Sequence, residues 1–219
     1  MDKKLHAMVL GATGATGQEL VKQLLNDFNF DKVSVFIRGV LNIEHKKLVK
    51  HKIDFSRINE YKPLVSGDVL FSAFGTTKKD AGSEKNQYLI DYTYQYEFAK
   101  LASENGVTTY SLVSSAGANE KSLFFYPKIK GALEESVKKL LFNKIQIFQP
   151  PILIRQPELI RKGERIAINI LKIFNKIGVL KSQKPLLVHD LAKKMISELT
   201  SKNTDRIIIY KPNDLFRKN

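Results

Sequence analysis

The chain has 219 residues, 43% of them hydrophobic and 26% charged, which is ordinary for one globular domain with a full core. It has no cysteine, which excludes disulfides and thiolate chemistry. The net charge of +14 comes from lysines that stand singly or in pairs along the whole chain, so we expect a solvated basic surface and no nucleic-acid binding.

Targeting, membrane and metal signals are not predicted. The N-terminal sequence MDKKLHAMVLG has no signal-peptide pattern, and no apolar run reaches the roughly 20 residues of a membrane-spanning helix. We therefore expect no stable membrane insertion. The four histidines, His6, His45, His51 and His189, lack metal-ligand spacing and predict no metal site. Together with the missing cysteine, these features indicate a cytoplasmic protein.

The first predicted strand, Met8–Leu10, leads into Gly11, Gly14 and Gly17 and then into a helical pattern over Glu19–Phe28. This order brings backbone N–H groups and a helix N-terminus against a phosphate. The glycines would make a tight turn, admit a pyrophosphate and let the helix pack close to the strand. The spacing is GxxGxxG rather than GxGxxG, and three close glycines also occur in simple turns. The place near the N-terminus, between strand and helix, favours a dinucleotide site.

The second predicted strand, Asp31–Ile37, ends at Arg38, which lies 21 positions after Gly17. The residue at this place faces the adenosine ribose, where an acidic side chain suits NAD and an arginine suits the 2′-phosphate of NADP. The alternative is an ordinary surface arginine. The pattern predicts NADP(H) as cofactor in preference to NAD(H).

The third and fourth predicted strands are Leu48–Asp54 and Asp68–Phe74. The Asp54 carboxylate is placed either to accept from an adenine amino group or to cap the following turn. Gly75–Thr77 closes the fourth strand with small residues, over which a cofactor can lie. We interpret Lys78–Lys85 as a polar loop.

Helical and strand patterns then alternate: a helix over Gln87–Asn105, a strand over Thr108–Val113, a helix over Leu123–Leu141 and a strand over Lys144–Phe148. This alternation predicts an α/β fold with a Rossmann-like, doubly wound parallel sheet, whose cofactor half covers about residues 1–150.

The remaining elements are too few for a second domain. Pro157–Gly178 reads as a basic amphipathic helix that packs over a site or another subunit, with a membrane surface as the alternative. A short strand at Leu186–Val188, a helix from His189 and a last strand at Arg206–Tyr210 follow. We expect one domain, 1–219, with a small C-terminal substrate-side cap over about 151–219. The long apolar helices suit a homodimer interface.

Three residues carry candidate chemistry. Tyr126 and Lys130 are four positions apart and therefore share one face of a helix. A neighbouring ammonium stabilises a phenolate and lowers the tyrosine pKa from about 10 toward neutrality. Ser115 follows the fifth strand, where its hydroxyl can hold a substrate oxygen that Tyr126 protonates. The alternative is a partly buried tyrosine beside a solvated lysine.

The motifs VLGATGATG, FGTTKKDAG, LVSSAGAN, FYPKIKGALEESV and VHDLAKKM resemble the atypical branch of the short-chain dehydrogenase/reductase superfamily. Within it, the chain is most similar to the Tat-interacting-protein family of oxidoreductase-like proteins. The resemblance implies NADP(H) at the glycine turn and Arg38, adenine near Asp54, ribose contacts by Lys130, and Tyr126 as acid/base assisted by Ser115. Two positions depart from the family pattern. Gly39 replaces a second basic residue, which weakens the NADP preference, and Gln149–Pro151 replaces Arg-Pro-Gly, which alters the nicotinamide-side loop.

These arguments together give a predicted site. Its cofactor-binding residues are Gly11, Thr13, Gly14, Ala15, Thr16, Gly17, Arg38, Asp54, Phe74, Gly75, Thr76, Ser114, Tyr126, Lys130 and Pro150; its catalytic residues are Ser115, Tyr126 and Lys130. The predicted function is NADP-dependent oxidation or reduction of a small alcohol or carbonyl. A non-catalytic NADP-binding regulator or sensor and a sugar-nucleotide epimerase-like enzyme remain alternatives.

Overall fold

The computed structural model describes residues 3–156 and 184–217. Its central element is a parallel sheet of seven strands in the order β3-β2-β1-β4-β5-β6-β9. The strands are β1 (Leu5–Leu10), β2 (Phe30–Ile37), β3 (Leu48–Lys52), β4 (Val69–Ser72), β5 (Thr109–Val113), β6 (Lys144–Phe148) and β9 (Ile207–Tyr210). With helices on both faces, this order is the Rossmann-like doubly wound arrangement, and the predicted fold class is confirmed.

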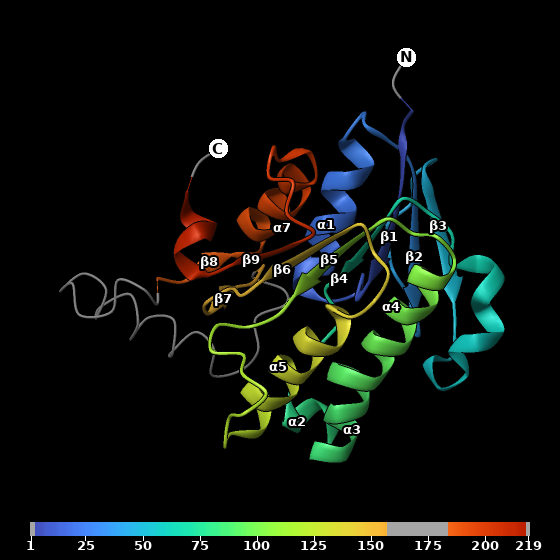
Figure 1. Ribbon diagram of the computed structural model, residues 1–219. Coiled ribbons are helices and arrows are strands. Elements are labelled where there is room, and N and C mark those ends of the chain that lie inside the picture. Colours follow the sequence, from blue (N-terminus) through green and yellow to red (C-terminus); the bar gives the residue numbers. More distant parts are fainter. Residues whose placement is uncertain (1–2, 157–183, 218–219) are drawn as a thin grey trace.

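The helices lie in two layers. They are α1 (Ala15–Asn26), α2 (Lys78–Ala81), α3 (Glu84–Tyr88), α4 (Tyr94–Glu104), α5 (Phe125–Val137) and α7 (Val188–Ser197), with short 3-10 helices at Phe55–Leu64, Glu198–Thr200 and Pro212–Phe216. As Figure 1 shows, α1 and α7 cover one face of the sheet and α4 and α5 cover the other. Among the described residues, no helix combines the length and apolar character needed to cross a membrane.

Each layer buries an apolar stripe against the sheet. Leu20 and Leu24 of α1 and Leu191 and Met195 of α7 are fully buried in one cluster with Val9 of β1. On the opposite face, the buried residues of α4 and α5 (Phe98, Ala99, Leu101, Ala102, Leu133 and Val137) pack on Met8, Leu10, Leu70, Leu112, Ile145 and Ile147. Burial of one such leucine or phenylalanine stabilises the fold by roughly 1.5–3 kcal/mol, so these stripes fix the helices and the loops between them.

The C-terminal third differs from the expected cap over residues 151–219. Strand β9 pairs with β6, with Ile207 opposite Ile145, and α7 packs against α1, so both belong to the main layers. The reason is their apolar residues, since Leu191 and Met195 of α7 and Tyr210 of β9 are buried in the same cluster as α1. Strands β7 (Leu153–Ile154) and β8 (Leu186–Leu187) form a separate two-stranded ribbon. The helix expected at Pro157–Gly178 lies outside the described residues.

The segment expected to be a polar loop, Lys78–Lys85, is instead helical. It contains α2 and the start of α3, because two side chains cap these helices. Thr77 accepts a hydrogen bond from the Asp80 N–H, and Ser83 accepts one from the Asn86 N–H. The capping pattern, rather than hydrophobic periodicity, is the signal in this polar stretch.

The long helix expected over Gln87–Asn105 is interrupted. A π-helical turn at Leu89–Thr93 separates α3 from α4. This turn buries Asp91, a carboxylate that is only 1% exposed. Single π-turns in helices often accompany functional sites, and Asp91 lies beside the candidate site.

Candidate functional site

The glycine turn forms a close-packed cradle between β1 and α1. Gly11 has a φ of +79°, and a Cβ on it would lie 2.4 Å from the Ala73 carbonyl oxygen. A Cβ on Gly17 would lie 2.0 Å from the Gly11 carbonyl oxygen, and one on Gly14 would lie 3.3 Å from the same atom. The first helical turn of α1 carries no acidic residue and no side-chain cap, which leaves its N–H groups for an anion. The cradle fits a dinucleotide pyrophosphate.

A cavity of about 770 Å³ opens beside this cradle. Elements far apart in the sequence contribute to it: the first turn of α1, the ends of β4 and β5, the helices α2, α3 and α5, and the β7–β8 ribbon. It is lined by nine of the predicted residues, namely Gly14, Ala15, Thr16, Phe74, Gly75, Thr76, Ser114, Tyr126 and Lys130. The sequence-predicted cofactor turn and the Tyr–Lys pair therefore share one cavity.

The other predicted residues do not line this cavity: Gly11, Thr13, Gly17, Arg38, Asp54, Ser115 and Pro150. Arg38 is exposed directly after the last residue of β2. The Pro150 carbonyl accepts a hydrogen bond of 2.9 Å from the Ala116 N–H, which ties the loops after β5 and β6 together. A contact of each of these residues with the cofactor stays a prediction.

Asp54 has the capping role that was the alternative reading of its sequence position. Its carboxylate accepts hydrogen bonds from the Ser56 hydroxyl (2.7 Å) and the Ser56 N–H (2.9 Å) at the start of the 3-10 helix. These hydrogen bonds hold the pKa of the Asp54 carboxyl below its usual value. The stabilisation of the turn accounts for this carboxylate, and the adenine contact stays a prediction.

Lys130 is almost completely buried on α5, one helical turn after Tyr126. Its Nζ donates a hydrogen bond of 3.1 Å to the Val113 carbonyl at the end of β5. Burial lowers the pKa of the Lys130 ammonium, and the charges of Asp91 and Glu134 oppose this effect. Tyr126 keeps 41% of its surface exposed and lines the cavity together with Lys130.

The two serines after β5 differ in their contacts. Ser114 is buried and lines the cavity, and its hydroxyl donates to the Glu134 carboxylate. The Ser115 hydroxyl donates to the neighbouring Ala116 carbonyl at 3.2 Å, and Ser115 lies outside the cavity lining. The structure therefore brings Ser114, rather than Ser115, next to the Tyr–Lys pair. A hydrogen bond from Ser115 to a substrate oxygen would require its hydroxyl to rotate away from Ala116.

Sequence reasoning missed Glu134, a buried carboxylate one helical turn after Lys130. It accepts hydrogen bonds from Ser114 and from the Gln149 amide, whose Nε2 lies 3.0 and 3.1 Å from the two carboxylate oxygens. The available signal was its spacing, because a residue four positions after Lys130 lies on the same face of α5. The Gln149 amide is a neutral hydrogen-bond partner for the Glu134 carboxylate.

Asp91 was also missed. Its carboxylate accepts from the Thr76 N–H (2.7 Å) and from the Gln87 amide (3.2 Å). These contacts fix the backbone of the loop after β4, which lines the cavity. The signal was one acidic residue within the aromatic pattern of the predicted helix. Asp91 and Glu134 place two negative charges around the buried ammonium of Lys130.

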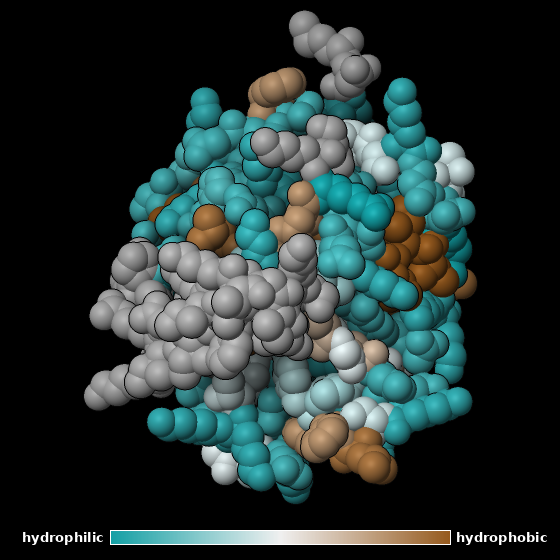
Figure 2. Space-filling view, turned by 90° about the vertical axis from the view of Figure 1, so that its left-hand side faces the viewer, coloured by the Kyte–Doolittle hydropathy of each residue, from teal (hydrophilic) through white to brown (hydrophobic). Residues whose placement is uncertain are grey.

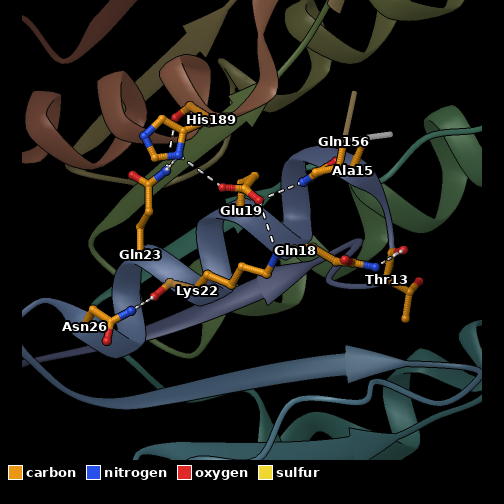
Figure 3. A network of polar contacts seen from close by, with 9 residues as sticks. All are labelled: Thr13, Ala15, Gln18, Glu19, Lys22, Gln23, Asn26, Gln156 and His189. Atoms are coloured by element: carbon orange, nitrogen blue, oxygen red, sulfur yellow. Dashed lines mark hydrogen bonds and ion pairs between the residues drawn. The ribbon is translucent and has the colours of Figure 1, made fainter. Parts of the chain in front are cut away.

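A hydrogen-bond network joins the cradle to the C-terminal part of the chain (Figure 3). Gln156 donates to the buried Glu19 carboxylate (2.8 Å) and to the Ala15 carbonyl (3.0 Å). The His189 Nδ1 atom lies 3.2 Å from the other oxygen of Glu19. Burial alone would raise the pKa of Glu19, but the hydrogen bonds of Gln156 and His189, together with nearby Lys22, hold the pKa below its usual value. Glu19 thus connects α1, the chain after β7 and the start of α7.

Replacing Glu19 with alanine is expected to lower the free energy of unfolding by about 1–3 kcal/mol at neutral pH, because Gln156 loses a buried acceptor. The pKa of Glu19 is lowered in the folded protein, so its stabilisation is present above the pKa of an unfolded glutamate and is lost as the pH falls through the folded-state value. The difference between wild type and Glu19→Ala in urea unfolding should therefore shrink at acid pH. Glu60→Ala, which breaks an exposed pair with Arg57, is the control and should change stability by less than about 0.5 kcal/mol. A difference for Glu19→Ala that does not vary with pH would contradict this account.

Comparisons with known proteins agree with the geometry. A family model described as NAD(P)H-binding matches residues 11–145. Protein HTATIP2 of Rattus norvegicus is 34% identical over 73% of this chain and 67% of its own length. The mitochondrial protein FMP52-1 of Scheffersomyces stipitis is 37% identical over 77% of this chain and 76% of its own. FMP52 of Candida albicans is 33% identical over 97% of both chains.

Solved structures share the fold at low sequence identity. A UDP-N-acetylglucosamine 4-epimerase from Methanobrevibacter ruminantium M1 superposes with a TM-score of 0.71 and 17% identity, over 96% of this chain and 77% of its own. The enzyme WbmH of Bordetella bronchiseptica, in complex with NAD+, has a TM-score of 0.71 and 15% identity, over 94% and 74% of the two chains. The family match confirms the prediction of a nicotinamide dinucleotide cofactor.

The expected cytoplasmic location is wrong by the same comparisons. The FMP52 relatives from Scheffersomyces stipitis, Debaryomyces hansenii, Candida albicans and Kluyveromyces lactis are named as mitochondrial proteins. The prediction rested on the missing cysteine and the missing secretory signal. Neither feature distinguishes the cytoplasm from other compartments in which thiols stay reduced.

Proposed function

Because the chain belongs to the NAD(P)H-binding family, in the atypical short-chain dehydrogenase/reductase group of the HTATIP2 and FMP52 proteins, we propose that it is an NADP(H)-dependent oxidoreductase of a carbonyl compound or alcohol. One observation supports this most directly. Tyr126 and Lys130 line the same cavity as Gly14, Ala15 and Thr16 of the cofactor cradle. A cofactor seated on the cradle would thus lie within reach of a proton donor.

The bound cofactor would supply hydride transfer between the nicotinamide and the substrate carbon. Tyr126 donates its phenolic proton to the carbonyl oxygen in reduction and accepts the alcohol proton in oxidation. Lys130 stabilises the phenolate form of Tyr126 from the next turn of α5 and contacts the ribose. Ser115 or Ser114 accepts or donates a hydrogen bond at the substrate oxygen, from the end of β5.

The buried carboxylates support Lys130 in this proposal. An ammonium in an apolar interior tends to lose its proton, and an uncharged Lys130 would not stabilise a phenolate. The charges of Asp91 and Glu134 favour the protonated form. Asp91 also holds the loop at Thr76, and Glu134 holds the Ser114 hydroxyl, so the charge and the cavity wall are fixed by the same residues.

The preference for NADP over NAD is tested by Arg38→Ala. A charge-assisted contact of Arg38 with the 2′-phosphate is worth about 1.5–3 kcal/mol, so the variant should bind NADPH about 10–100-fold more weakly and NADH with unchanged affinity. Titration of reduced-nicotinamide fluorescence at constant moderate salt measures both. Arg57→Ala is the matched control, because Arg57 is exposed and pairs with Glu60 on the surface. Equal loss for both cofactors, or equal affinities in the wild type, would remove Arg38 from this role.

Turnover decides between the enzyme and the alternative of a non-catalytic sensor. We expect NADPH oxidation when the full chain is supplied with a panel of simple aldehydes and ketones. Tight NADPH binding without turnover of any carbonyl would favour the sensor.

The homodimer stays a prediction, checked by light scattering of the purified chain.

A further inference from the structure

The walls of the cavity differ in chemistry. The cradle and the loop after β4 contribute mostly small and polar residues to its lining, together with the aromatic Phe74. The start of α5 and the β7–β8 ribbon with its continuation into α7 contribute a second, apolar group to the lining: Phe125, Ile152, Leu153 and Val188. A substrate carbonyl held at Tyr126 would therefore direct its substituents toward apolar side chains.

The apolar wall continues onto the surface. Leu123 and Phe124, which directly precede Phe125, are 99% and 77% exposed. Ile152 and Leu187, from the two sides of the ribbon, are 42% and 47% exposed. Figure 2 shows brown and tan atoms at the lower edge of the face where Figure 1 places the chain entering α5. Single exposed apolar residues are common, but Ile152 itself lines the cavity and the other three directly precede the lining residues Phe125 and Val188.

The charged residues around the cavity are already engaged. Lys78 forms an ion pair of 2.8 Å with Glu84 at the rim. Lys130 is buried and donates to the Val113 carbonyl, and Arg155 interacts with another group of the chain. A diphosphate on the substrate would have to compete for these cations, beyond the pyrophosphate that the glycine cradle accepts. Because the described cations that line the cavity already have partners, the cavity disfavours a nucleotide-linked substrate.

We propose that the substrate of this site is a carbonyl compound with a bulky apolar substituent, such as a long-chain aldehyde, rather than a sugar nucleotide or a small hydroxylated carbonyl. The inference rests on the proposed function. The carbonyl oxygen lies at Tyr126, and the apolar substituent extends along Phe125, Ile152 and Val188 toward the exposed Leu123 and Phe124. The reaction is hydride transfer from NADPH to the carbonyl carbon with a proton from Tyr126 to the oxygen, which yields the alcohol, NADP+ and the Tyr126 phenolate; the phenolate then takes up a proton from water.

The test is a homologous series of straight-chain aldehydes from butanal to decanal, with glyceraldehyde as the hydroxylated comparison, all assayed with NADPH and the full chain. The kcat/KM value is expected to rise by about two- to fourfold per added methylene until the cavity is filled. Glyceraldehyde should be turned over less efficiently than butanal. A flat or falling series with efficient turnover of glyceraldehyde would overturn the apolar-substrate inference and leave the proposed function in place. Absence of turnover for every carbonyl by NADPH-bound protein would overturn both.

A pair of matched variants tests where the chain-length dependence arises. Leu123 precedes α5 on the cavity side, whereas Leu141, 82% exposed, follows α5 on the side where β6 begins. Leu123→Ser is expected to reduce kcat/KM for decanal about threefold or more and to flatten the series, and Leu141→Ser is expected to leave the series unchanged. Both substitutions are at exposed positions, so folding is preserved. A steep series that Leu123→Ser and Ile152→Ser both leave intact would place the apolar substituent elsewhere and overturn the assignment of this wall.

Discussion

Replacing Tyr126 with phenylalanine is expected to reduce NADPH-dependent carbonyl turnover by about 10²–10⁴-fold. The substitution removes one hydroxyl and keeps the ring, so the packing of α5 and the shape of the cavity are retained. NADPH affinity should change little, because the cradle at Gly11–Gly17 is untouched. The kcat of wild type and variant with the same aldehyde, together with an NADPH titration of each, measures both parts.

Tyr88→Phe provides the matched control for this experiment. Tyr88 is 40% exposed and Tyr126 is 41% exposed; Tyr88 is the last residue of α3 and Tyr126 the second residue of α5. Tyr88 stacks on Tyr92 and does not line the cavity, so its hydroxyl has no part in the proposed reaction. A turnover rate for Tyr126→Phe equal to that of wild type would exclude Tyr126 as the proton donor.

The pH dependence of turnover is a further test of the role of the Lys130 charge. Burial lowers the pKa of Lys130, so its ammonium is lost at a lower pH than that of an exposed lysine. Turnover of the wild type should fall on the alkaline side as Lys130 loses its charge. In this proposal, Asp91 and Glu134 keep Lys130 charged at neutral pH.

Sequence patterns predicted the order of elements well where apolar periodicity decides it. The sixth strand was placed at Lys144–Phe148 and β6 has the same bounds. The prediction failed at Asp91, because a π-turn inserts one residue into a helix without changing its composition. The last strand was predicted at Arg206–Tyr210 and β9 covers Ile207–Tyr210, but its place beside β6 was not predicted, because this pairing joins residues about 60 positions apart, as Ile145 opposite Ile207 shows. Local patterns carry no information on such distant pairing.

The site could be predicted in part for the same reason. Helix spacing relates Tyr126 to Lys130 and turn geometry relates the cradle glycines, and Tyr126, Lys130 and Gly14 line one cavity; their roles stay predictions. Glu134 acts through Ser114 and Gln149, which come from two other elements, so its role appears only in three dimensions. The buried ammonium needs these remote partners, and a linear motif shows only the half of the arrangement that lies on one helix.

Gly17→Ala is expected to weaken NADPH binding by at least about 100-fold and to lower the free energy of unfolding by about 1–3 kcal/mol. The added Cβ would lie 2.0 Å from the Gly11 carbonyl oxygen, 2.6 Å from its carbon and 2.9 Å from the Ala12 Cα atom. All three are backbone atoms of the cradle, so no side chain can rotate to make room. The helix α1 must move away from the turn, which separates its N–H groups from the phosphate position.

The other glycines make this a graded experiment. Gly14→Ala places its Cβ 3.3 Å from the Gly11 carbonyl oxygen, a contact that a shift of a few tenths of an ångström relieves, so a smaller loss of NADPH affinity is expected. Gly39→Ala is the control, because Gly39 has no positive φ and no atom lies within 4 Å of its added Cβ. Fluorescence titration with NADPH and urea unfolding of the three variants should give the order Gly17, Gly14, Gly39 from the largest effect to the smallest. If Gly17→Ala bound NADPH as tightly as Gly39→Ala does, close packing of α1 on the turn could not be what holds the cofactor.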